Sequence, residues 1–395
     1  MRKNLTIAAA AALLAVVAGC SKTDMTPGDT YASAIGFSPI NGKLSTKAMI
    51  DGTEYKSSDP TFGTLAYYLA ADSEDEKTWS DNMAEASLFI PVSEVSYKES
   101  VNTWSTAVPY YWPTTGGLTF FAYSPYYYQE EGNTDTPIAV ETLDGNSGIV
   151  FHDYDVDAHQ NTDFMVADLA VDQTANGTNG GYKGVPIVFK HKLSQIVGIN
   201  FLTVGKDAES NLVEKDYANT HTEGSYVAGD VVFKLKKVTV NNLLYKGNYG
   251  YFSTKDEFWN LTDARKAYTW FDDSTATAFS GNTKFNLTYN TQDKSRNDYL
   301  LILPQPLNKI GATTADTAHY PAISIEYQVL TYNGTKFTTE NVSKTISLYD
   351  MHEQASEIAM GKKITYTFKI NLEDRQIYWA PSVADWDDQS YESVI

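Results

Sequence analysis

The segment Ile364-Thr365-Tyr366-Thr367-Phe368-Lys369-Ile370-Asn371 shows the pattern that decides the fold. Its apolar residues occupy every second position, and threonine, lysine and asparagine stand between them. Because successive side chains of a β-strand point to opposite faces, a period of two predicts a strand with one buried face and one solvated face. The segment therefore predicts β-structure near the C-terminal end of the chain.

Strand-like segments recur through the rest of the sequence. Apolar residues alternate with other residues at 231–236 and at 323–329. The continuous apolar run 299–303, which ends at Pro304, is typical of a strand buried on both faces. Further strand candidates lie at 88–92, 118–123 and 187–189.

Turn signals between these segments complete the fold prediction. Asn333-Gly334 follows a predicted strand at the place where a two-residue type I′ hairpin turn would stand. Helix is expected only in short pieces, such as 208–214 or 261–267. Many short strands separated by glycine, asparagine, aspartate and proline predict an all-β protein built from antiparallel β-sandwiches. The glycine-rich loop 174–184 is the candidate domain boundary.

The composition agrees with a folded, acidic, β-rich protein. The chain has 395 residues, 42% of them hydrophobic, which is enough for two ordinary domains or one large one and excludes wholesale disorder. The net charge of −19 argues against nucleic acid as a partner, because phosphate binding needs clustered positive charge. The 28 tyrosines exceed the 17 phenylalanines, which favours half-buried pleated surfaces.

The first residues form an export signal. Arg2 and Lys3 precede an apolar run that ends in small residues, which predicts a secretory signal peptide over residues 1–19. Val17-Ala18-Gly19-Cys20 resembles a bacterial lipobox, and Cys20 is the only cysteine of the chain. We therefore expect lipidation of Cys20; the alternative is an ordinary signal peptide with a chance cysteine. Several acyl chains would hold such a protein firmly on a membrane.

A search for catalytic motifs finds none. The six histidines are scattered, no His-Glu-x-x-His or Gly-x-Ser-x-Gly motif occurs, and the loop 177–184 lacks the Gly-Lys-Ser/Thr ending of a phosphate-binding loop. A pair of carboxylates for glycoside hydrolysis cannot be singled out among 49 acidic residues. We therefore expect no catalytic residues, no cofactor and no enzymatic activity.

Two clusters carry weaker hypotheses. Asp153, Asp155 and Asp157 are spaced to present oxygens to Ca²⁺, but Ala158 and Phe164 stand where a calcium loop needs glycine and glutamate. We therefore expect a solvated acidic turn and no metal. A set of aromatic residues could stack on sugars, although cross-strand packing is the expected role. The set is Trp104, Tyr110, Tyr111, Trp112, Tyr126, Tyr127 and Tyr128.

Several segments together resemble the fimbrillin (Mfa-like, type V pilin) family of Bacteroidales surface lipoproteins. They are the lipobox with its tether, the early strand 35–39 and the segment 45–48, Asp163–Ala167 followed by a Phe-x-His-x-Leu strand at 188–196, the run 301–305, and the C-terminal pair 361–370 and 377–386. The resemblance extends over nearly the whole chain.

The resemblance implies two transthyretin-like antiparallel β-sandwich domains in tandem. The expected segments are the signal peptide 1–19, a tether and first strand at 20–47 that is removed as a propeptide, an N-terminal domain at 48–184 and a C-terminal domain at 185–395. In the family an Arg/Lys-specific surface protease cuts after an early basic residue, and Lys47, followed by Ala48, matches that position. His191 matches a fold-defining strand, where we expect it buried with a satisfied imidazole.

The resemblance also implies a function. It predicts a structural or adhesive subunit of a cell-surface fimbria, anchored in the outer membrane by lipid at Cys20 and assembled by strand exchange after cleavage at Lys47. The expected partners are other fimbrial subunits, the protease, and host or bacterial surface ligands. The alternative is a non-polymerising surface lipoprotein that binds glycans through exposed aromatic side chains.

Overall fold

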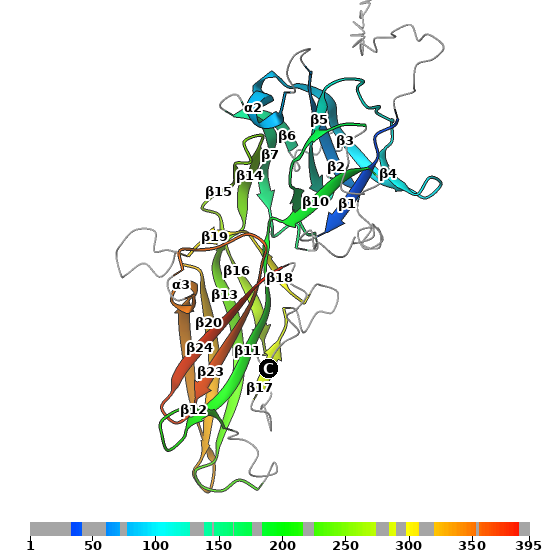
Figure 1. Cartoon of the computed structure of the whole chain (residues 1–395). Helices are drawn as coiled ribbons and strands as arrows, with labels where there is room; N and C mark the ends of the chain where they lie inside the picture. The colour runs from blue at the N-terminus through cyan, green and yellow to red at the C-terminus, as the bar shows by residue number, and fades with distance from the viewer. Residues whose placement is uncertain are drawn as a thin grey trace, which may run out of the picture.

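The structure is a computed structural model of the chain. It describes residues 33–41, 61–71, 77–126, 138–143, 146–160, 162–175, 184–215, 225–273, 284–289, 298–307, 320–352 and 355–386. Strands dominate these ranges and confirm the all-β prediction; the helical pieces within them are α2 (Trp79–Asn82), η1 (Met83–Glu85) and α3 (Leu348–Met351). No helix in the described ranges is long and apolar enough to span a membrane. The molecule is elongated, with the first strands at one end and the C-terminal strands at the other (Figure 1).

The N-terminal end is built on a sheet that closes on itself. Its order is β2-β3-β4-β1-β10-β8-β5-β9, and β5 pairs with β2 as well, so the path returns to its first strand. The strands are β1 (Phe37–Asn41), β2 (Phe62–Leu69), β3 (Ser87–Lys98), β4 (Thr103–Thr106), β5 (Gly117–Ser124), β8 (Met165–Ala167), β9 (Ala170–Gln173) and β10 (Val185–His191). Closure leaves β1 as the strand between β4 and β10.

Alternation along these strands divides the apolar residues between two cores. Phe120 and Ala122 of β5 belong to the cluster inside the closed sheet, whereas Phe121 and Tyr123 belong to a second cluster. The second cluster includes residues of a four-stranded sheet in the order β15-β14-β7-β6. These strands are β6 (Ile138–Leu143), β7 (Asn146–Asp155), β14 (Lys246–Phe252) and β15 (Glu257–Leu261).

The strand pairings bear on the division expected at 184/185. Strand β10 begins directly after it and hydrogen-bonds to β1 and β8 of the closed sheet. Strand β14 of the β14–β15 hairpin also pairs with β7, although it begins only at Lys246, well after β10 ends at His191. A cut at 184/185 would therefore separate strands that pair with each other.

The C-terminal end is a sandwich of two sheets. One sheet has the order β12-β11-β23-β24, with β17 and β18 also paired to β11; the other has the order β16-β13-β20-β21. The strands are β11 (Ser194–Lys206), β12 (Leu212–Glu214), β13 (Val231–Leu244), β16 (Arg265–Asp272), β17 (Lys284–Leu287), β18 (Leu300–Ile302), β20 (Ala322–Tyr332), β21 (Phe337–Ser347), β23 (Lys362–Asn371) and β24 (Gln376–Asp385). Most side chains of the largest core cluster come from these two sheets, and Leu348 and Met351 of α3 add to it.

Two strand predictions are confirmed in detail. In β23 the residues Ile364, Tyr366, Phe368 and Ile370 are all buried, and the residues between them are half-buried. In β18, Leu300 and Ile302 belong to the C-terminal core, whereas Leu301 belongs to the second N-terminal core. A continuous apolar run therefore marks the strand that both ends of the molecule share.

Three local predictions are wrong. The helix expected at 208–214 is a turn followed by β12, and the one expected at 261–267 contains the end of β15 and the start of β16. The turn at Asn333-Gly334 is a four-residue connection, because Tyr332 pairs with Phe337. Only Gly334 has positive φ there. The Asn333 side chain accepts hydrogen bonds from the main-chain N–H groups of Thr335 and Lys336.

Strand β24 forms one edge of its sheet, and a proline interrupts that edge. Trp386 donates its main-chain N–H to Gly361, and the β23–β24 register pairs Tyr366 with Pro381. Hydrogen-bonded pairs alternate along an antiparallel ladder. The main-chain groups of residues 384, 382 and 380 therefore bond to β23, whereas those of Pro381 face away from β23. The N–H that proline lacks would therefore have pointed to the free edge, where its absence hinders pairing with another chain.

The burial of His352 predicts that the stability of the C-terminal core depends on pH. It follows α3, and its Nε2 lies 2.9 Å from the Tyr366 hydroxyl. Burial lowers the pKa of His352 from its usual 6.5, so the folded chain binds this proton less readily than the unfolded chain. Neutral His352 therefore contributes to the free energy of unfolding above pH 6.5, and this contribution is lost as the pH falls below 6.5 toward the lower pKa of the folded chain. Urea midpoints at about pH 7.5 and about pH 5 should therefore differ less for His352→Gln than for the parent. Equal differences would contradict this assignment.

Candidate functional site

The candidate site is the position of β1 in the closed sheet, which confirms the early strand predicted around 35–39. β1 pairs in parallel with β10 over all five residues, from Phe37 opposite Val185 to Asn41 opposite Phe189. With β4 it pairs at Phe37 alone, opposite Trp104. The strand is therefore joined to the sheet mainly along one side.

Side chains of the first segment complete the inner core. Ile35 is 3% exposed and Phe37 is 2% exposed. The Phe37 ring packs edge-on against Phe62 at 5.9 Å and Phe120 at 5.7 Å between ring centroids. Phe62 in turn contacts Phe189 and Trp104. Residues 35–37 thus lie over a floor of aromatic rings contributed by β2, β4, β5 and β10.

The entry to this position is tight. The Val185 N–H donates to the Gly36 carbonyl at 2.8 Å, and Ile35 donates to Tyr110 at 2.8 Å. Gly184 has φ +126°, and a Cβ at this residue would lie 2.6 Å from the Gly36 carbonyl oxygen. Glycine at 184 is therefore required both by its backbone conformation and by the close approach of the β1 segment.

The arrangement can hold an extended strand without any chemistry at its side chains. Removal of β1 would interrupt the closed sheet between β4 and β10. The main-chain groups of β10 that bond to β1 would lose their partners, and the aromatic floor around Phe62 and Phe120 would be exposed to solvent. A groove of this kind fits a strand with apolar residues at alternate positions. The predicted residues Cys20, Lys47 and Ala48 lie outside the described residues, and their roles stay predictions.

His191 lies at the end of β10, where the chain crosses to β11. Its side chain is largely buried, and its Nδ1 lies 2.6 Å from Asp163 Oδ2, so the expected buried and satisfied imidazole is confirmed. The ring also stacks on Trp386, with 4.2 Å between centroids and 5° between planes. The sequence pattern did not predict this contact, which joins the end of β24 to the crossing between the two ends of the molecule.

Loss of the Trp386 stack should loosen this junction. Trp386→Ala is expected to lower the free energy of unfolding by about 1–3 kcal/mol, because the indole packs against the second N-terminal core as well as His191. The matched control is Trp379→Ala in β24, the strand that Trp386 directly follows; Trp379 is 40% exposed, so its loss should cost less. Denaturant unfolding followed by tyrosine fluorescence compares the two. A larger effect at Trp379 would refute the role of the stack.

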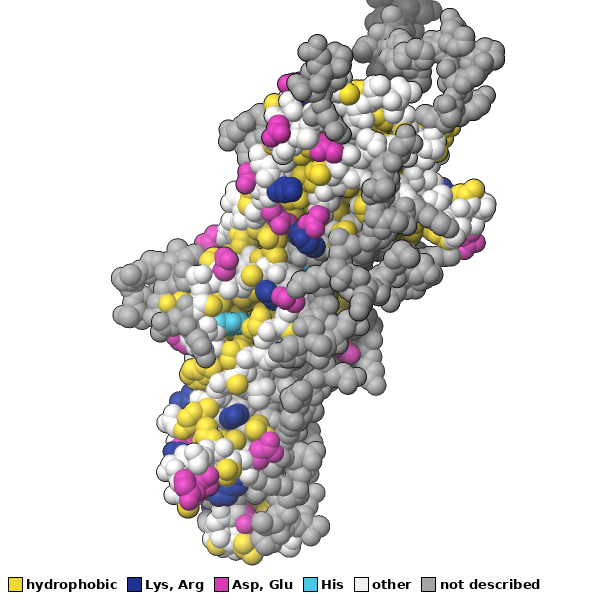
Figure 2. Space-filling model, in the orientation of Figure 1, with side chains coloured by type: hydrophobic (Ala, Val, Ile, Leu, Met, Phe, Trp, Pro, Cys, Tyr) yellow, Lys and Arg dark blue, Asp and Glu magenta, His cyan; other side chains and the backbone are white. Residues whose placement is uncertain are grey.

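The acidic turn is held by lysines. Asp155 lies 3.1 Å from Lys246, and Asp157 lies 2.5 Å from Lys266. Asp155 Oδ1 also accepts the main-chain N–H groups of residues 157 and 158. Acidic and basic side chains are interspersed in the same way over the face shown in Figure 2. Within the described ranges, no group of three or more His, Cys, Asp or Glu residues is arranged to hold a metal ion.

The predicted aromatic clusters are mostly structural. Trp104 and Trp112 are buried and belong to the inner core, whereas Tyr111 is 54% exposed. Tyr127 and Tyr128 lie outside the described residues. The aromatic packing expected for Trp104 is present, since its ring contacts Tyr97 as well as Phe62.

Comparison with known proteins gives matches over most of the chain. The model of a family described as fimbrillin-like matches residues 70–386. The chain is 24% identical over 406 residues to "Fimbrium subunit Fim1C" of Phocaeicola vulgatus, covering 96% of this chain and 95% of that protein.

A solved structure shares the fold. The crystal structure of a fimbrial protein from Bacteroides vulgatus superimposes with a TM-score of 0.58 at 16% identity, covering 89% of this chain and 99% of that one. Because the family model matches residues 70–386, which is well over half of the chain, the chain belongs to the fimbrillin-like family.

Proposed function

We propose that this protein is a structural or adhesive subunit of a cell-surface fimbria, without catalytic activity, and that subunits join by exchange of the strand in the β1 groove. The observation that carries the proposal is the position of β1, which closes the N-terminal sheet and covers an aromatic floor with Ile35 and Phe37. Its main chain pairs continuously with β10 alone. Membership of the fimbrillin-like family supports the same function.

Export and anchoring precede assembly in this proposal. The signal peptide 1–19 directs secretion, and acylation of Cys20 ties the chain to the outer membrane through the tether that leads to β1. While the tether is intact, β1 is part of the same chain as its groove. Its effective concentration then greatly exceeds that of a strand from a neighbour.

Cleavage after Lys47 removes this advantage. An Arg/Lys-specific surface protease that cuts between Lys47 and Ala48 would act six residues beyond the end of β1 at Asn41. The cut leaves β1 held by noncovalent contacts alone and releases the segment that carries Cys20. A strand of a neighbouring subunit can then replace it, pairing with β10 and placing alternate side chains on the aromatic floor. Such a head-to-tail contact does not close on itself and builds a filament.

A double variant tests the proposal. Lys43→Ala/Lys47→Ala removes the expected cut site and the nearest basic substitute, and neither residue is part of a described strand. The variant should remain folded, lipidated and monomeric at the cell surface. Surface extracts run without boiling should lose the ladder of high-mass bands, and mass spectrometry should find an N-terminus at acylated Cys20. Polymers of parental length that retain residues 20–47 would show that strand removal is not the trigger.

A further inference from the structure

The outer edge of β15 lies at the junction of the two ends of the molecule (Figure 1). β15 is the outermost strand of its sheet, and among the described strands it pairs with β14 alone. Thr262 donates to the Lys246 carbonyl, and Phe252 donates to the Asp256 carbonyl, so the even-numbered residues of β15 bond to β14. The main-chain N–H and C=O groups of Glu257, Trp259 and Leu261 therefore point away from the sheet. In the part of the chain that the structure describes, they make no hydrogen bond.

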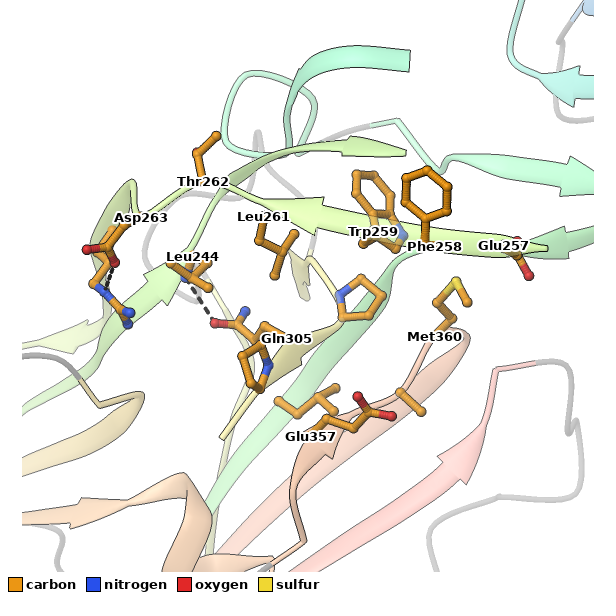
Figure 3. Close-up of a pocket in the computed structure, with 15 residues that line it drawn as sticks. Leu244, Glu257, Phe258, Trp259, Leu261, Thr262, Asp263, Gln305, Glu357 and Met360 are labelled. Carbon is orange, nitrogen blue, oxygen red and sulfur yellow. Dashed lines mark hydrogen bonds and ion pairs between the residues drawn. The ribbon is translucent and has the colours of Figure 1, made fainter. Parts of the chain in front are cut away.

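A hollow of about 910 Å³ lies beside β15. Figure 3 shows it between β15 and the short strand pair β19 (Gln305–Pro306) and β22 (Glu357–Ile358). Apolar side chains line much of it: Leu244, Leu261, Pro304, Pro306, Ile358 and Met360. A volume of this size is in the range of ligand sites in proteins. The strand edge and the apolar hollow thus share one location.

This edge lacks the protection seen on other edges. β24 places Pro381 at an outward position, and the exposed residues of the edge strand β21 are polar or charged. β15 contains neither proline nor lysine. Its one charged residue, Glu257, is engaged by Lys192 at 2.6 Å and by the Tyr249 hydroxyl. Natural edge strands without such devices readily pair with another extended chain.

The charge at the rim of the hollow selects among partners. Glu357 is exposed there and has no ionic partner in the described part of the chain, whereas Asp263 is paired with Arg265 at 2.7 Å. An unneutralised carboxylate beside an apolar hollow favours a lysine or arginine of the ligand. The main-chain groups at Glu257, Trp259 and Leu261 repeat about every 7 Å, which matches alternate residues of an extended peptide. A saccharide has no matching series of paired donors and acceptors.

We propose that β15 and this hollow bind an extended segment of another polypeptide chain, which adds to β15 as a further strand. Apolar side chains of the segment would enter the hollow at alternate positions, and a lysine or arginine would lie beside Glu357. This site is separate from the β1 groove, so it would exist in the monomer and in the filament alike. It gives the subunit a lateral attachment point that strand exchange in the β1 groove does not use.

Selection from a phage library of random seven-residue peptides on the full-length chain tests the site. Two variants serve as counter-targets: Ala359→Trp, which fills the hollow from an exposed position, and Glu357→Lys, which reverses the rim charge. Their matched controls are Ala380→Trp and Glu209→Lys, which alter exposed residues elsewhere. Enriched peptides should alternate apolar residues and carry at least one lysine or arginine.

Affinities of the synthesised peptides decide the outcome. Binding should weaken at least tenfold for Ala359→Trp and about fivefold or more for Glu357→Lys, and should be unchanged for both controls. N-methylation of alternate peptide nitrogens in the register that faces β15 should also weaken binding at least tenfold, because it removes main-chain donors. Equal binding by the methylated peptide would overturn the proposal. Selected peptides that bind the parent, both variants and both controls with equal affinity would also overturn the proposal. The Lys43→Ala/Lys47→Ala variant should bind these peptides normally, so this outcome is independent of assembly.

Discussion

Phe368→Ala is expected to lower the free energy of unfolding by about 3–5 kcal/mol. Phe368 is fully buried in β23, and its ring stacks on Phe201 of β11 at 5.5 Å. Truncation removes the transfer free energy of the ring and leaves a cavity between the two sheets, which the paired strands on either side cannot fill by moving. An effect of this size is a large part of the stability of an ordinary domain.

The neighbouring residue provides the control. Thr367 lies on the opposite face of β23 and is half-buried, so Thr367→Ala should cost about 1 kcal/mol or less. Urea unfolding of both variants, followed by circular dichroism, gives the two midpoints. Similar midpoints would mean that the two residues do not face opposite environments and that the alternation from 364 to 370 does not define the core.

Local pattern was sufficient for the parts of the fold that depend on one strand. The period of two at 364–370 identified the buried face of β23, and the unbroken apolar run at 299–303 identified β18, which both ends of the molecule share. Each of these patterns arises because the strand meets a fixed environment on each face. The helix expected at 261–267 failed for the same reason: this segment contains the end of β15 and the start of β16, whose pairing partners override weak helical preference.

Pairings between distant segments left no local signal. The closure of the N-terminal sheet through β2 and β5, and the return of β14 to pair with β7, depend on contacts between residues far apart in sequence. The β1 site shows the same limit. The strand itself was predicted from its sequence, but the floor of Phe62 and Phe120 follows from the register of three strands. The stack of Trp386 on His191 also required the fold, because nearly 200 residues separate them.

A chain cut at position 47 should exchange β1 for an added peptide, whereas the intact chain should exclude it. The cut is made by a sequence-specific protease at a recognition site introduced around Lys47, outside the described strands. A labelled peptide of residues 33–41 then competes with the retained strand for the groove, and fluorescence anisotropy measures its uptake. The intact chain excludes it because its own β1 is covalently tethered, with a far higher effective concentration.

Substituted peptides show whether the aromatic floor supplies the affinity. Burial of a large apolar side chain contributes about 1.5–3 kcal/mol, so the Phe37→Ala peptide should bind roughly ten- to a hundredfold more weakly than the parent. The Ser38→Ala peptide alters the next residue, which is only half-buried, and should lose at most about fivefold. Similar losses for both peptides would mean that main-chain pairing with β10 alone holds the strand. Uptake by the intact chain at the rate of the cut chain would mean that the tether does not retain β1, and cleavage could not then control assembly.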